Sequence, residues 1–145
     1  MPAEPDSFAV AEDQIRTARQ DVEVAEGKVN DAKSEVAAAT REVDAADRKV
    51  EVADRKVNDA WHNLRQARRA LRECSAADKS DYEEDVTNAR KRLTNAQDRL
   101  TNAQQGLTNA QQGLTNAQQG LTAAQDLHTG AVNVLTSLQG MVLCN

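Results

Sequence analysis

The chain has 145 residues and a formal net charge of −5; 39% of its residues are hydrophobic, but only 2% are aromatic. This composition lacks the large side chains of a conventional globular core, and its acidic balance argues against a general nucleic-acid binder. No run of about 18 apolar residues occurs and the first residues are acidic, so we expect neither a membrane-spanning helix nor a signal peptide.

Residues 1–7 precede any hydrophobic pattern, and we expect them to be disordered. From residue 8 a large apolar residue recurs every seven positions, and a small one follows three positions after each. The large residues are Phe8, Ile15, Val22, Val29, Val36, Val43, Val50, Val57, Leu64 and Leu71. The small residues are Ala11, Ala18, Ala25, Ala32, Ala39, Ala46, Ala53, Ala60, Ala67 and Cys74. These heptads predict a charged first helical arm over residues 8–74.

Residues 75–85 form an acidic segment in which the heptad register slips, because Leu71 and Val86 are 15 rather than 14 residues apart. Ser80 and Glu83 have the spacing of a capping box, which marks the start of a helix. We therefore predict a turn between two helices. The segment lacks Gly and Pro, however, so one continuous helix with a skip residue stays an alternative.

A second helical arm is predicted over residues 86–145. Its large residues run every seven positions from Val86 to Leu121, meet His128, and continue with Leu135 and Val142. Small residues again follow three positions later, and near-identical LTNAQQG units make up the middle of the arm. Their glycines, at 106, 113 and 120, are explained either by tandem duplication or by close packing of a neighbouring helix.

Size complementarity favours an antiparallel hairpin folded about residue 80. Large residues of one arm then face small residues of the other, so that Leu64 meets Ala96 and Ala60 meets Leu100. This resembles the Alacoil pattern of closely spaced antiparallel helices, an architecture that unrelated proteins share and that implies no activity. The predicted fold is all-α: a long antiparallel two-helix coiled-coil hairpin, which could assemble into a local four-helix bundle.

Near the predicted turn, basic side chains of both arms come together in what we call the basic collar. Its members are Arg65, Arg68, Arg69, Arg72, Arg90, Lys91 and Arg92. The collar is a candidate site for an anionic partner. The alternative, which we favour, is that these cations balance the acidic residues of the segment 75–85.

At the other end of the hairpin the apolar face broadens beyond the heptad seam. The additional apolar residues, which we call the docking end, are Val10, Val24, Leu127, Val132, Val134, Met141 and Leu143. One partner helix does not cover a face of this width, so we predict self-association or partner docking there. A frayed, sticky terminus without a specific partner is the alternative.

The remaining polar candidates are weak. His128 lies in the seam, opposite Ala32 in the predicted register, where a ligand or pH-switch role competes with a tolerated defect. Cys74 and Cys144 are too far apart in the predicted hairpin for an internal disulfide, although Cys144 could link two molecules. No catalytic residues, no cofactor site and no metal site can be assembled from the sequence.

We therefore expect a non-enzymatic structural or interaction module, a rigid spacer or assembly element inside the cell. Its expected partner is a protein or a second copy of itself, with no small-molecule substrate and no nucleic acid. The alternative is an amphipathic helical protein associated with a membrane or pore, which the scarcity of Lys and Arg after Arg99 disfavours. A weak binder of anionic partners through the basic collar is the third candidate.

Overall fold

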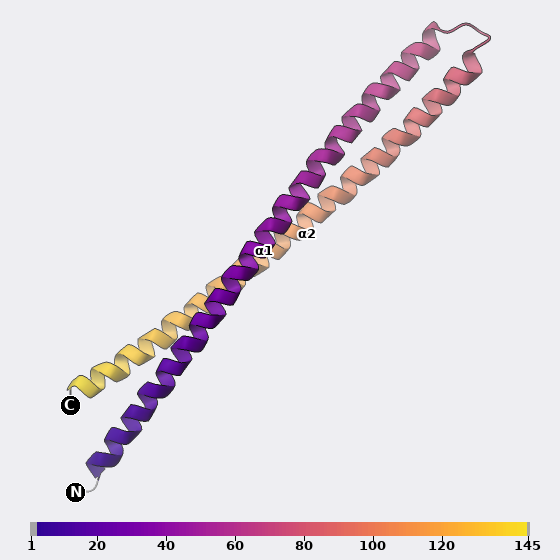
Figure 1. The fold of residues 1–145 in the computed structure, drawn as a ribbon. Coiled ribbons are helices and arrows are strands. Elements are labelled where there is room, and N and C mark those ends of the chain that lie inside the picture. Colours follow the sequence, from indigo (N-terminus) through magenta and orange to yellow (C-terminus); the bar gives the residue numbers. More distant parts are fainter. Residues whose placement is uncertain (1–2, 145) are drawn as a thin grey trace. The chain divides into compact units, whose positions relative to one another are not determined.

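The computed structural model describes the backbone of residues 3–144 and the side chains of residues 9–143. The described chain consists of two long helices, α1 (Ala3–Glu73) and α2 (Lys79–Cys144), which pack against each other (Figure 1). Between them the backbone is non-helical over residues 74–78. The fold is thus all-α, and the predicted helical hairpin is present in place of one continuous helix.

Both helices begin earlier than the sequence predicts. α1 already includes residues 3–7, which we expected to be disordered. Pro5 lies in its first turn, where the missing N–H removes no helical hydrogen bond. α2 includes residues 79–85 of the predicted acidic turn, with Asp81 in its first turn. Acidic residues are stabilising at that end of a helix because of its positive dipole, so this segment lengthens the helix.

A compact turn connects the helices. The backbone N–H of Asp78 donates to the Ser75 carbonyl at 3.1 Å, and the Asp78 carbonyl accepts from the N–H groups of Asp81 and Tyr82. The Ser75 hydroxyl donates to a carboxylate oxygen of Asp78 at 3.0 Å. No described residue of the chain has a positive φ, so the reversal requires no glycine. This explains why the sequence carries no Gly or Pro signal at the turn.

Burial follows the seven-residue spacing of the sequence. Among the described side chains, every residue that is not exposed occupies a predicted seam position, apart from Ala70, Tyr82 and Gln139. No polar or charged described residue is fully buried. The apolar contact between the helices is therefore a narrow strip, and stability has to come from many small layers along it.

The chain divides into two compact units. The unit next to the turn, the turn unit, comprises residues 41–112. Its core joins both helices and has these buried members: Val57, Ala60, Leu64, Val86, Ala89, Leu93 and Ala96. Leu64 is 1% exposed and is the largest fully buried side chain. The core thus lies beside the turn and comes from both α1 and α2.

The second unit, the terminal unit, combines residues 1–40 with residues 113–145, so it holds both ends of the chain. Its buried residues are all alanines: Ala18, Ala25, Ala32 and Ala124. The large seam residues there, such as Val22 and Val29, are only half-buried. The terminal unit therefore leaves more of its apolar surface in contact with solvent than the turn unit does.

Alanines of both helices line the grooves beside the seam. Ala60, Ala89 and Ala96 line one groove of the turn unit. Ala53 and Ala103 line a second, and in the terminal unit Ala25 and Ala131 line a third. The chain reverses over residues 74–78, before the predicted residue 80, so the pairing of the helices is shifted from the predicted register.

Candidate functional site

The docking end is solvent-exposed in the terminal unit. The exposed fractions are 55% for Val10, 58% for Val24, 59% for Leu127, 36% for Val132, 55% for Val134, 64% for Met141 and 86% for Leu143. These residues lie outside the seam on their helices, which is why the partner helix does not cover them. The side chain of Phe8, the first large residue of the predicted seam, lies outside the described residues.

Two grooves of the terminal unit bring docking-end residues of α1 and α2 together. Val24 and Leu127 line one groove, and Val10 and Val134 line the other. Asp21 lines both grooves, so they adjoin along the same face. Alanines of the seam form the floor, because a methyl group is too short to fill the space between two helices. Four residues of the docking end thus form aliphatic rims of two shallow grooves, while Val132, Met141 and Leu143 line neither groove.

Charge in these grooves comes from one helix only. α1 contributes Asp13, Asp21 and Lys28, whereas α2 contributes apolar residues alone. The stretch from Leu127 to Leu143 contains no Asp, Glu, Lys or Arg. Arg16 forms an ion pair with Asp13 at 3.4 Å, with both side chains largely exposed. Such an exposed pair adds little stability, so apolar contact is the main property that α2 offers a partner.

His128 lies between the helices of the terminal unit. Its Nε2 atom is 3.6 Å from Oε1 of Glu26, and its side chain is 33% exposed. This nitrogen is buried but has no hydrogen-bond partner. The contact with Glu26, rather than a position opposite Ala32, agrees with the shifted register. A buried nitrogen without a hydrogen bond is unfavourable, so in this chain His128 weakens the seam.

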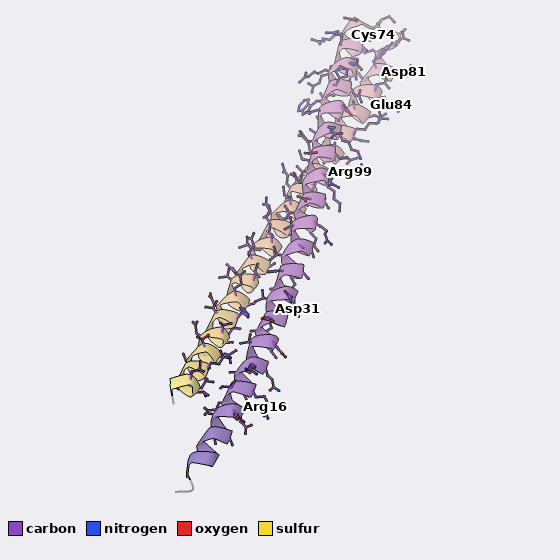
Figure 2. All side chains as sticks on the ribbon, turned by 60° about the vertical axis from the view of Figure 1, so that its left-hand side comes forward. Arg16, Asp31, Cys74, Asp81, Glu84 and Arg99 are labelled. Carbon is purple, nitrogen blue, oxygen red and sulfur yellow. The ribbon has the colours of Figure 1, made fainter. Side chains whose placement is uncertain are left out.

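All seven residues of the basic collar lie in the turn unit, and all are exposed. Figure 2 shows Asp81 and Glu84 at the start of α2, near Cys74 at the end of α1. Among the described residues, no ion pair joins the collar to these carboxylates; Lys79 instead pairs with Glu83 at 3.9 Å. The favoured explanation, that these cations balance the acidic residues of segment 75–85, stays a prediction, with no direct ion pair among the described residues to support it.

The structure reveals a different set of cations, which the sequence reasoning missed. Two grooves of the turn unit share Lys56 and Arg99, and together they form what we call the basic groove. Its cationic lining residues are Arg48, Lys49, Lys56, Arg92 and Arg99. Of the collar, only Arg92 belongs to it.

A sequence signal for the basic groove exists. Lys49, Lys56, Arg92 and Arg99 each directly precede a large seam residue. In an antiparallel pair, the residues at this position of both helices flank the same side of the interface. Recognising the groove therefore required the antiparallel pairing and its register, not only the positions of the charges.

The remaining candidates show no built site. The Sγ atom of Cys74 is half-buried and lies 3.1 Å from the Leu71 carbonyl, as expected of a structural thiol. The side chain of Cys144 lies outside the described residues. Trp61 is 38% exposed, and His62 is exposed. Within the described residues no cluster of His, Cys, Asp or Glu is suited to a metal ion.

Along the described stretch, neither helix contains a segment long and apolar enough to cross a membrane. No protein-family model matches the sequence, and a search of curated proteins finds no significant match. The function must therefore be argued from the surfaces of the two units alone.

Proposed function

We propose that the chain is a non-enzymatic structural or interaction module: an antiparallel coiled coil that acts as a spacer or assembly element and docks through its apolar end. Heptad spacing in the sequence, together with burial at the same positions, supports the coiled-coil assignment. Docking at the terminal unit is supported by its exposed apolar side chains, of which Val10, Val24, Leu127 and Val134 line two adjoining grooves. Exposed apolar residues gathered on one surface are typical of interaction sites.

One observation carries the proposal. Val24 and Leu127 belong to different helices, are each more than half exposed, and line the same groove. A two-helix unit cannot bury such a pair by itself, because each helix already uses its seam against the other. A third and fourth helix would cover both rims, as in a four-helix bundle.

Sedimentation of the full-length chain tests this proposal. Leu127, Val134 and Met141 all directly precede seam positions of α2, and replacing each with Gln removes apolar surface without breaking the helix. We expect the wild type to sediment as an oligomer and this triple variant as a single chain. Circular dichroism should show unchanged helix content, since these side chains are exposed in one copy.

A matched control comes from the turn unit. Val52 is 45% exposed and equally aliphatic, but lies outside the docking end. Val52→Gln should leave the sedimentation mass unchanged.

If the wild type is itself monomeric, self-association is wrong and a different protein must be the partner. Flotation with liposomes then tests the membrane alternative, which predicts that the triple variant loses lipid binding.

A further inference from the structure

Like charges face each other across the basic groove, which is unusual at the interface of two helices. One part of the groove is lined by Lys56 and Asn63 of α1 and by Arg92 and Arg99 of α2. The groove continues along α1, where Arg48 and Lys49 line it. Asp59 is the only carboxylate among the lining residues. Antiparallel helices usually place opposite charges on the two sides of their interface, since like charges destabilise the pairing.

These cations are available to a partner. Arg48, Lys49, Lys56, Arg92 and Arg99 are all exposed, and none of them belongs to an ion pair within the part of the chain that the structure describes. Within the described residues, no ion pair therefore offsets their repulsion across the groove. An anionic group bound between the two rims would relieve it and would interact with both helices at once.

Between the charged rims, the floor of the groove is apolar. It consists of the seam alanines Ala53, Ala60, Ala89, Ala96 and Ala103, whose methyl groups leave the groove open. Val52, which is 45% exposed, adds apolar surface outside the seam, and Asp59, Asn63 and Asn95 add polar lining at one end. The two connected spaces measure about 300 Å³ and about 350 Å³. A ligand that fits this surface needs an apolar strip for the floor and negative charges on both sides of that strip.

We propose that the basic groove binds an acidic amphipathic α-helix of a partner protein. Such a helix places Leu or Ala residues on the alanine floor and Glu or Asp side chains beside the Lys and Arg rims, which is helix-in-groove recognition. The lining residues of α1 extend from residue 48 to residue 63. This length of helix, about 24 Å, corresponds to a partner segment of about four turns.

Other occupants fit the groove less well. A nucleic acid would meet the cations with its phosphates but would not cover the apolar floor, and the groove contains no aromatic side chain on which a base could stack. A second copy of this chain offers no purely acidic face of the required length, because Lys and Arg interrupt the carboxylates of α1 and α2 is nearly uncharged after Arg99.

A fluorescently labelled 18-residue synthetic peptide tests the proposal, with Leu and Ala on one helical face and Glu on both sides of that face. Its binding to the full-length chain is measured by fluorescence anisotropy. A scrambled peptide of the same composition keeps the charge but loses the amphipathic face, and a labelled DNA duplex serves as the nucleic-acid probe. We expect the amphipathic peptide to bind, and the scrambled peptide and the duplex to bind at least about tenfold more weakly.

The double variant Lys56→Glu/Arg99→Glu reverses charge on both rims, and should weaken peptide binding by at least about tenfold. A matched control, Arg41→Glu/Arg55→Glu, makes the same change of charge at exposed positions of α1 outside the groove and should leave binding within about twofold. If the reversed charges unfold the chain, Lys56→Gln/Arg99→Gln provides the milder test and should also weaken binding.

Three results would overturn the proposal: no binding of the amphipathic peptide, equal binding of the scrambled peptide or the duplex, or equal losses in groove and control variants. A drop in sedimentation mass of Lys56→Glu/Arg99→Glu would show that a second copy occupies the groove, which also contradicts it. The docking-end triple variant should bind the peptide normally. Loss of peptide binding at the basic groove is thereby distinguished from loss of self-association at the docking end.

Discussion

Ala60 of α1 and Ala96 of α2 are both buried and line the same groove. Their proximity means that the two helices of the turn unit approach each other through methyl groups on this side of the seam. The larger residues Leu64 and Leu93 belong to the same core. Large and small residues of both helices therefore contribute to the core beside this groove.

Engineered cysteines test which residues of the two helices lie together. In a background with Cys74 and Cys144 replaced by Ser, the pair Ala60→Cys/Ala96→Cys should form an intramolecular disulfide on mild oxidation, because both residues line one groove. The pair Ala60→Cys/Leu100→Cys, which fits the register about residue 80, should oxidise more slowly, because Leu100 does not line that groove. Mobility in non-reducing gels measures both. Faster closure of the second pair would support the register about residue 80.

The buried core of the turn unit should dominate stability. Leu64→Ala removes the side chain that is 1% exposed, and we expect the free energy of unfolding to fall by about 3 kcal/mol. Leu107 occupies the same kind of seam position in that unit but is only half-buried. Leu107→Ala should cost about half as much. Urea unfolding followed by circular dichroism provides both free energies of unfolding. Equal losses for Leu64→Ala and Leu107→Ala would mean that the two side chains are equally buried in solution.

The repeated glycines should be replaceable. A Cβ atom added at Gly106, Gly113 or Gly120 would meet nothing within 4 Å, so the close-packing explanation for these glycines is wrong within a single chain. Each Gly→Ala substitution should stabilise α2 by about 1 kcal/mol, because alanine loses less backbone entropy in a helix. Thermal unfolding measures the gain. A loss of stability that depends on protein concentration would instead place these glycines against a second chain.

The start of α2 should depend on Asp78 rather than on Ser80. The Asp78 carboxylate accepts from the Ser75 hydroxyl, and the Asp78 carbonyl accepts the first helical hydrogen bonds, whereas Ser80 already lies within α2. We expect Asp78→Ala to lower the free energy of unfolding by about 1 kcal/mol, because it removes the side-chain hydrogen bond with Ser75, and Ser80→Ala to change it little. The reverse order would support the predicted capping box of Ser80 and Glu83.

Replacing His128 should strengthen the terminal unit. A leucine side chain at this position would continue the aliphatic series of α2, and the substitution would remove a buried nitrogen that has no hydrogen-bond partner. We therefore expect His128→Leu to raise the free energy of unfolding by about 1 kcal/mol. His62, which is exposed, provides the control, since His62→Leu should have almost no effect. Destabilisation by His128→Leu would show that the contact with Glu26 is favourable.

Periodicity alone predicted most of what a two-helix fold requires. The buried positions, from Ala18 to Ala124, follow from the heptads, and the exposure of Val24 and Leu127 follows from their lying outside the seam. The turn was harder to place, because Ser75 and Asp78 close it without Gly, Pro or a positive φ. An error of a few residues there shifted every expected contact between the helices.

The same error concealed the basic groove. Lys56 and Arg99 are far apart in sequence, and each is surrounded by residues of mixed charge or none. Only the pairing of α1 with α2 brings them to one groove. The collar around Arg68 and Arg69, by contrast, was conspicuous as a run of charges, but a run along one helix does not define a concave surface.

The LTNAQQG units have a consequence for folding. Because successive units offer the opposing helix nearly identical side chains, sliding by one unit would replace each contact in the middle of α2 with an almost equivalent one. The five residues between Glu73 and Lys79 forbid that slide, since they connect the helices at a fixed offset. Lengthening this connection by a flexible insertion should therefore yield several alternative alignments that exchange slowly, even though no side chain of the seam has changed.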